Sequence, residues 1–126
     1  MTELTLKVLI NKSPAEVFNF TLDPKNTPKW LDFIVQEETN EWPPKLGTKY
    51  RNCGPDKQWR EYELEIFEPN HRFSLKKLTT PYHVEYTFNP VNTGTELVYH
   101  EWVDSGEVDS PFTLEILEKL KQVVEA

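Results

Sequence analysis

The C-terminal segment, residues 111–126, restricts the fold more than any other part of the sequence. At 100° per residue, its apolar side chains fall within about 140° of arc, and they are Phe112, Ile116, Leu117, Leu120, Val123 and Val124. Charged residues fill the opposite side. Ser110 is expected to cap a helix here, and Pro111 suits the first helical position, where no amide hydrogen is needed. The segment therefore predicts a helix of roughly 22 Å whose apolar stripe must be buried against another element.

Before this helix, most of the chain alternates polar and apolar residues as β-strands do. A first strand runs to Ile10, and residues 13–16 form a capping box that starts a short helix, which Pro24 ends. Thr27, followed by proline, is expected to cap a second short helix that contains Trp30. Six antiparallel strands joined by hairpin-length loops are predicted next, at residues 34–41, 47–53, 58–68, 72–78, 82–89 and 95–103.

Composition argues against several classes of function. The 126 residues include 21 acidic and 14 basic side chains, a formal net charge of −7, whereas a nucleic-acid surface needs a basic stripe. No apolar run is long enough for a membrane span, and the N-terminal MTELTLKVLI lacks the pattern of a signal peptide. We therefore expect a single domain over residues 1–126, located in the cytoplasm, with neither a nucleic-acid partner nor a membrane span.

Hairpin pairing predicts which side chains face the C-terminal helix, because residues opposite each other in an antiparallel pair share a face. Pairing Phe88 with Leu97 in the last hairpin places Glu101 inside. The inner face then also carries Tyr62, Leu64, Ile66, Phe73, Leu75, Val84, Tyr86 and Tyr99. The same reasoning in an earlier hairpin adds Tyr50, Asn52 and Arg60. A slip of one residue is the open alternative for the last hairpin, and it would turn inward Val98, His100 and Trp102.

Several segments, taken in order, resemble one known superfamily. They are INKSPAEVF at 10–18, Trp30 in the second short helix, FEPNHRF at 67–73, GTEL at 94–97 and the terminal amphipathic helix. Together they resemble the START-like (SRPBCC) superfamily, most closely its polyketide cyclase/dehydrase and lipid-transport group and next its Hsp90-ATPase-activator-like group. The resemblance implies an α+β helix-grip fold, in which a seven-stranded antiparallel sheet wraps around a long C-terminal helix and two short helices lie between strands 1 and 2. It also implies a cavity that binds lipids, polyketides or similar molecules.

The predicted interior combines apolar walls with few polar groups, as a small-molecule pocket does. The residues expected to contact a ligand are Trp30, Tyr50, Tyr62, Leu64, Phe73, Val84, Tyr86, Tyr99, Glu101, Phe112, Ile116 and Leu120. In the alternative reading, these side chains fill the core completely, and the tyrosine hydroxyls bond to backbone or water.

Neither a metal nor a cofactor is predicted. A metal site would need three converging ligands, whereas His71 is predicted in a turn and His83 and His100 on the outer face of the sheet. Cys53 is the single cysteine, so it forms no internal disulfide, and no histidine near it in the sequence would make it a nucleophile. The sequence contains no phosphate-binding loop.

Three functions are compatible with these residues. The first is binding of a small hydrophobic or aromatic molecule between the sheet and the last helix. The second is a cyclase or dehydratase, with Glu101 as the base and Tyr86 or Tyr99 as the proton donor. The third is an interaction module like the Hsp90 activators, which would use Trp59 and Trp102 on the outer face. Such a surface would equally suit a homodimer.

Overall fold

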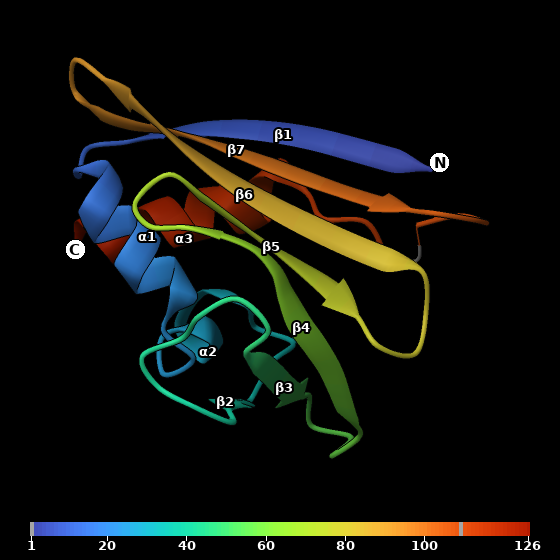
Figure 1. Ribbon diagram of the computed structural model, residues 1–126. Coiled ribbons are helices and arrows are strands. Elements are labelled where there is room, and N and C mark those ends of the chain that lie inside the picture. Colours follow the sequence, from blue (N-terminus) through green and yellow to red (C-terminus); the bar gives the residue numbers. More distant parts are fainter. Residues whose placement is uncertain (1, 109) are drawn as a thin grey trace.

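The strands form one antiparallel sheet that curls around the C-terminal helix (Figure 1). A computed structural model describes residues 2–108 and 110–126. The elements in chain order are β1 (Glu3–Ile10), α1 (Pro14–Leu22), α2 (Thr27–Trp30), β2 (Gln36–Thr39), β3 (Lys49–Cys53), β4 (Trp59–Glu68), β5 (Arg72–Lys77), β6 (Tyr82–Val91), β7 (Gly94–Val103) and α3 (Leu114–Glu125). The seven strands lie in the order β1-β7-β6-β5-β4-β3-β2. This is the α+β helix-grip arrangement that the sequence predicts.

Helix α1 begins at the predicted capping box and closes one end of the curved sheet. The Ser13 hydroxyl accepts a hydrogen bond from the Glu16 amide (3.2 Å), and the Glu16 carboxylate accepts one from the Ser13 amide (3.4 Å). On its inner side, the Phe18 ring packs at centroid distances of 6.0, 5.7 and 5.3 Å against the rings of Phe67, Phe73 and Phe88. These edge and tilted contacts join the helix to β4, β5 and β6.

Helix α3 starts later than predicted, at Leu114, and is about 18 Å long. Ser110 does not cap it: Ser110 has a φ of +52° and lies before the actual N-cap, Thr113. The Phe112 ring stacks on Tyr99 of β7, and this tertiary contact holds the chain extended where local signals favour a helix. The helix packs mainly against β1, with its start near α2. Within the described residues, no helix is long and apolar enough to cross a membrane.

The second short helix and the strand after it also differ from the prediction. Thr27 is the first residue of α2 rather than its cap, because its hydroxyl donates a hydrogen bond to the Glu37 carboxylate (2.6 Å). Strand β2 covers only part of the predicted 34–41 range. The Ile34 amide instead bonds to the Leu31 carbonyl (3.0 Å) in a turn, which delays the start of the strand.

The register of the last hairpin is the predicted one. Val84 lies opposite Glu101, and the pairs Tyr86–Tyr99 and Phe88–Leu97 follow on the same face. One inner-face assignment is wrong: a bulge between Leu64 and Ile66 shifts the alternation of β4. Beyond it, Phe67 instead of Ile66 contacts the Phe18 ring. The observed pairing of β6 with β7 excludes the one-residue slip, which would have placed Val98, His100 and Trp102 on the inner face.

On the outer face, β6 and β7 carry a stack of three rings. The Trp102 ring stacks with the imidazoles of both His83 and His100, at centroid distances of 4.9 and 4.7 Å. The His83 Nδ1 is 2.6 Å from the Glu65 carboxylate, and its Nε2 is 2.8 Å from that of Asp104. Burial lowers the pKa of His83, but the hydrogen bonds to the two carboxylates outweigh burial, so its net pKa is raised.

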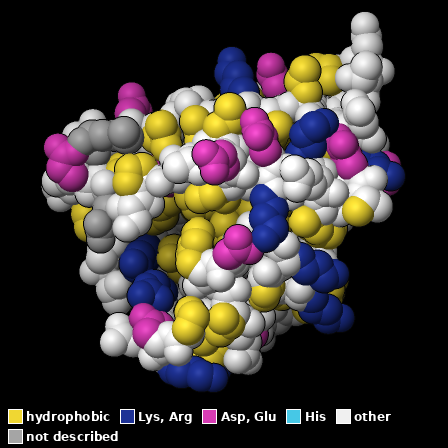
Figure 2. All heavy atoms as spheres, turned by 180° about the vertical axis from the view of Figure 1, so that it is seen from behind, with side chains coloured by type: hydrophobic (Ala, Val, Ile, Leu, Met, Phe, Trp, Pro, Cys, Tyr) yellow, Lys and Arg dark blue, Asp and Glu magenta, His cyan; other side chains and the backbone are white. Residues whose placement is uncertain are grey.

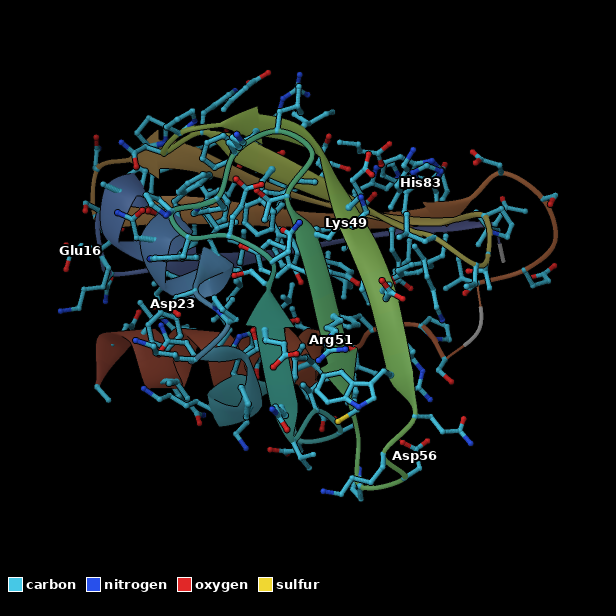
Figure 3. The ribbon with its side chains drawn as sticks, turned by 60° about the horizontal axis from the view of Figure 1, so that its bottom comes forward. Glu16, Asp23, Lys49, Arg51, Asp56 and His83 are labelled. Atoms are coloured by element: carbon cyan, nitrogen blue, oxygen red, sulfur yellow. The ribbon has the colours of Figure 1, made fainter. Side chains whose placement is uncertain are left out.

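Within the part of the chain that the structure describes, no three histidine, cysteine or acidic side chains are grouped to hold a metal ion. Trp59 lies elsewhere on the same face, under the guanidinium of Arg51 at 4.5 Å. Figure 3 shows Arg51 and His83 on separate parts of the sheet. The two outer-face tryptophans, Trp59 on β4 and Trp102 on β7, thus have β5 and β6 between them.

We predict that His83 gives the fold a pH-dependent contribution. Because its pKa is raised in the folded state, the protonated ring stabilises the fold below the ordinary pKa of about 6.5, and this contribution is lost as pH rises through the folded value. Urea unfolding of wild type and His83→Gln between pH 5 and 9 should show the largest stability difference at low pH. A difference that stays constant with pH would contradict this role.

Candidate functional site

A cavity of about 1030 Å³ lies between the inner face of the sheet, α2 and the start of α3. Its walls come from β2 to β7, from the end of α1 and from the segment before α3. At one end it reaches the β3–β4 and β5–β6 turns, where Pro55 and Pro81 belong to its lining. Figure 2 views the molecule from the side of α3, where hydrophobic side chains gather in a recess near the centre of the face.

Most of the predicted ligand-contacting residues line this cavity. They are Trp30, Tyr50, Tyr62, Phe73, Val84, Tyr86, Tyr99, Phe112 and Ile116. Leu64 and Leu120 are fully buried in the hydrophobic core and are not part of the lining. Glu101 is also outside the lining, although it is on the inner face as predicted. Asn52 and Arg60, expected on the concave side, both belong to the wall.

All five tyrosines of the chain line the cavity. Sequence reasoning places four of them inside and misses Tyr82, although Tyr82 continues the alternation of Val84 and Tyr86. Burial, together with nearby acidic groups, raises the pKa of Tyr50 and Tyr82. Their hydroxyls therefore stay protonated at neutral pH. The interior carries uncharged hydroxyl groups on apolar rings.

The Glu101 carboxylate is held behind this wall by three hydrogen bonds. The hydroxyls of Tyr82 (2.9 Å) and Tyr99 both donate to its Oε1, and the Phe112 amide donates to its Oε2 at 3.4 Å. Glu101 is only 1% exposed. A buried carboxylate requires such donors, because an unpaired charge would be very costly to desolvate. Arg60 does not neutralise it, since the Arg60 guanidinium lies 3.4 Å from Asp56 at the β3–β4 turn.

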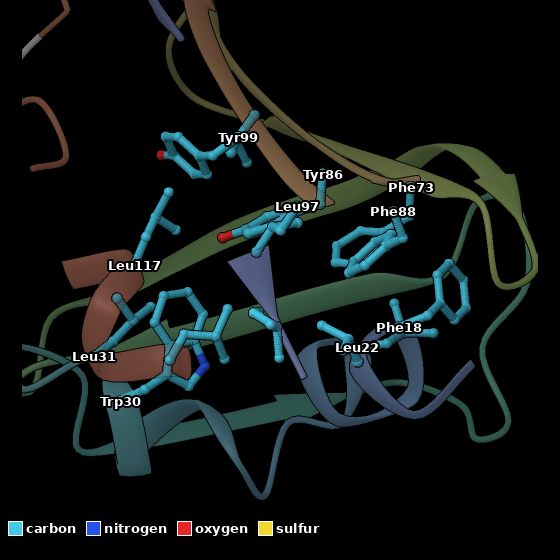
Figure 4. Close-up of a cluster of buried hydrophobic side chains, with 14 of the residues drawn as sticks. Phe18, Leu22, Trp30, Leu31, Phe73, Tyr86, Phe88, Leu97, Tyr99 and Leu117 are labelled. Atoms are coloured by element: carbon cyan, nitrogen blue, oxygen red, sulfur yellow. The ribbon is translucent and has the colours of Figure 1, made fainter. Parts of the chain in front are cut away.

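Aromatic contacts fix the segment that joins β7 to α3. The Phe112 ring stacks on Tyr99 at a centroid distance of 4.3 Å and an interplanar angle of 6°. Trp30 of α2 meets the same ring edge-on at 6.2 Å. Figure 4 shows Trp30 across the interior from Tyr86 on the sheet. The helices and the sheet are thus connected by rings on two sides of the cavity.

A second polar group in the wall comes from β2 and β3. Asn52 Nδ2 donates to Glu37 Oε2 at 3.0 Å, and the Thr27 hydroxyl donates to Glu37 Oε1. Burial raises the pKa of Glu37 in spite of these two hydrogen bonds. Sequence reasoning misses Glu37 because QEET, the sequence of β2, gives no apolar alternation that would mark an inner face.

We predict that Tyr99→Phe destabilises the fold by about 1–3 kcal/mol, because it removes a hydrogen-bond donor from a buried carboxylate. Tyr86→Phe is the matched control: in the described part of the chain, the Tyr86 hydroxyl has no hydrogen-bond partner. This control should cost less than about 1 kcal/mol. Urea unfolding of both variants measures the difference. Equal losses would show that the Glu101 cluster contributes nothing specific.

A family model described as polyketide cyclase / dehydrase and lipid transport matches residues 1–126. No curated protein matches the sequence significantly. Solved structures share the fold at low sequence identity. Protein CV1439 from Chromobacterium violaceum has 17% identity and a TM-score of 0.74, with 100% of this chain and 99% of that chain covered. The Aha1 dimer from Colwellia psychrerythraea has 12% identity and a TM-score of 0.72, with 99% and 97% covered.

A third similar structure is a protein of unknown function, SA2116, from Staphylococcus aureus. It has 18% identity and a TM-score of 0.69, and the match covers 96% of this chain and 80% of that chain. At these identities, the structural likeness establishes the shared fold. The function has to be argued from the site itself.

Proposed function

We propose that the cavity of this protein binds a small hydrophobic or aromatic molecule. The chain belongs to the polyketide cyclase/dehydrase and lipid-transport family, and this membership supports the proposal. The observation that carries the proposal is the cavity itself: about 1030 Å³ of space with five tyrosines and apolar side chains along its walls. Ligand pockets typically measure about 300–1,000 Å³ and have apolar walls with few polar groups. The cavity would therefore accommodate a molecule of several fused rings or a lipid chain.

The predicted cyclase or dehydratase activity has less support in the geometry. A general base must lie within hydrogen-bond reach of the atom that it deprotonates. Glu101 is outside the cavity lining, and its carboxylate accepts the hydroxyl protons of Tyr82 and Tyr99. Any proton transfer to Glu101 would thus pass through a tyrosine. Catalysis by Glu101 with Tyr86 or Tyr99 stays a prediction.

The predicted interaction module of the Hsp90-activator type also lacks a specific observation. Trp59 packs under Arg51, and Trp102 stacks with two imidazoles. They lie on β4 and β7 and do not form one continuous patch. The homodimer likewise stays a prediction, and we place the function in the cavity instead of on the outer face.

Binding should be abolished by filling the cavity from the helix side. Ile116 of α3 lines the cavity and is only partly buried, so Ile116→Trp would place an indole ring in the ligand volume. Val91→Trp is the control, because Val91 is exposed at the β6–β7 turn. A thermal-shift and native mass-spectrometry screen with lipids, polyketides and aromatic acids should find ligands that raise the Tm by several degrees at saturation.

Those ligands should raise the Tm of wild type and of Val91→Trp by the same amount. Adding them to Ile116→Trp should cause no change in its Tm. The proposal fails if no compound in the screen binds wild type. It also fails if Ile116→Trp binds the same compounds with unchanged affinity while remaining folded by circular dichroism.

A further inference from the structure

The tyrosine hydroxyls of the cavity do not all have the same hydrogen-bonding capacity. Tyr82 and Tyr99 donate their protons to the Glu101 carboxylate, and Tyr50 donates to the Leu22 carbonyl at 2.8 Å. A hydroxyl whose proton is committed in this way can only accept further hydrogen bonds. Of the two with protons committed to Glu101, Tyr82 is the one with exposed surface, whereas Tyr99 is completely buried. Tyr82 lines the cavity and its oxygen lies 3.2 Å from the Tyr99 hydroxyl, so towards a ligand it offers an acceptor and no donor.

A second acceptor in the wall has no partner. Asn52 is only 8% exposed, and its Nδ2 donates to Glu37, which leaves the Oδ1 without a hydrogen bond in the described residues. The Nε1 donor of Trp30 is buried and unpaired as well. A hydroxyl group can both donate and accept, so it could complement either kind of wall atom. An ether oxygen or a carboxylate can only accept.

The charges of the wall disfavour an anion in the interior. Three acidic residues, Glu37, Asp56 and Glu107, belong to the lining, and Glu101 lies directly behind it. Among the described lining residues, the cations are Arg60 and Lys77. Arg60 is paired with Asp56 at the β3–β4 turn, and Lys77 ends β5 at the same end of the sheet. Acidic groups thus outnumber cations in and behind the wall, and a carboxylate in the cavity would be repelled by them.

We propose that the cavity selects neutral aromatic molecules that carry a hydroxyl group, and that the Tyr82 oxygen accepts a hydrogen bond from the hydroxyl group of the ligand. This inference rests on the proposed binding function and adds the chemical class of the ligand. Glu101 is a positioning residue here, because it acts through Tyr82 by accepting the hydrogen bond that the Tyr82 hydroxyl donates. The hydroxyls of Tyr62 and Tyr86 have no partner in the described residues and can rotate, so they do not discriminate between donors and acceptors.

Three probes with the same two-ring skeleton test this selection by calorimetry. They are 2-naphthol, which donates and accepts, 2-methoxynaphthalene, which only accepts, and 2-naphthoate, which is an anion. Wild type should bind 2-naphthol at least about tenfold more tightly than 2-methoxynaphthalene, and 2-naphthoate most weakly. Equal binding of the first two probes would overturn the selectivity and leave the binding function intact. Binding of none of the three would overturn the selectivity as well, whereas the binding function itself is decided by the wider screen described above.

Glu101→Gln should move the naphthol-to-methoxynaphthalene ratio toward one. An amide offers a donor of its own and frees a tyrosine proton, which can then be donated to an ether oxygen. Glu118→Gln, on the exposed side of α3, is the matched control and should keep the wild-type ratio. If Glu101→Gln does not fold, Tyr82→Phe decides the question, because it removes the acceptor and leaves Glu101 with the Tyr99 and Phe112 donors. An unchanged ratio in the folded variant overturns the role of this cluster.

Discussion

The seating of α3 against the edge strand β1 is the constraint on which the interior depends. Leu117 and Leu120 are completely buried there, and burial of two leucines contributes about 1.5–3 kcal/mol each. Because the helix is anchored at one edge, it does not cover the middle of the sheet. The inner faces of β4 to β6 instead face α2 and the segment before α3. The cavity lies between the sheet and these two segments.

Buried polar groups around such a cavity need hydrogen-bond partners, and these partners must not occupy the space of the cavity. The structure does this at the wall: Glu101 takes hydrogen bonds from β6, from β7 and from the backbone before α3. The same contacts place the Phe112 ring on Tyr99, which holds the chain extended up to the start of α3. One buried carboxylate thus connects the fold of the C-terminal segment to the chemistry of the cavity.

The hairpin neighbours from β2 to β7 and most of the wall could be predicted from the sequence because alternation and hairpin pairing are local signals. The pairing of β1 with β7 joins distant parts of the chain and has no such local signal. The start of α3 could not, since Ser110 and Pro111 favour a helix and only the tertiary contact of Phe112 prevents it. The inward assignment of Ile66 failed at a bulge, which leaves no clear mark in an alternating strand. The inward position of Glu37 could not be predicted, because the short polar strand β2 has no apolar alternation that would indicate its inner face.

Ligand binding in the interior requires open space between the tyrosine wall and α3. A crystal of the ligand-free protein under xenon pressure tests it most directly, because xenon binds in apolar cavities. We expect xenon, or density from a copurified molecule, between Val84 on the sheet and Ile116 on the helix. A well-ordered interior in which side chains fill this space, with neither xenon nor other density, would contradict it.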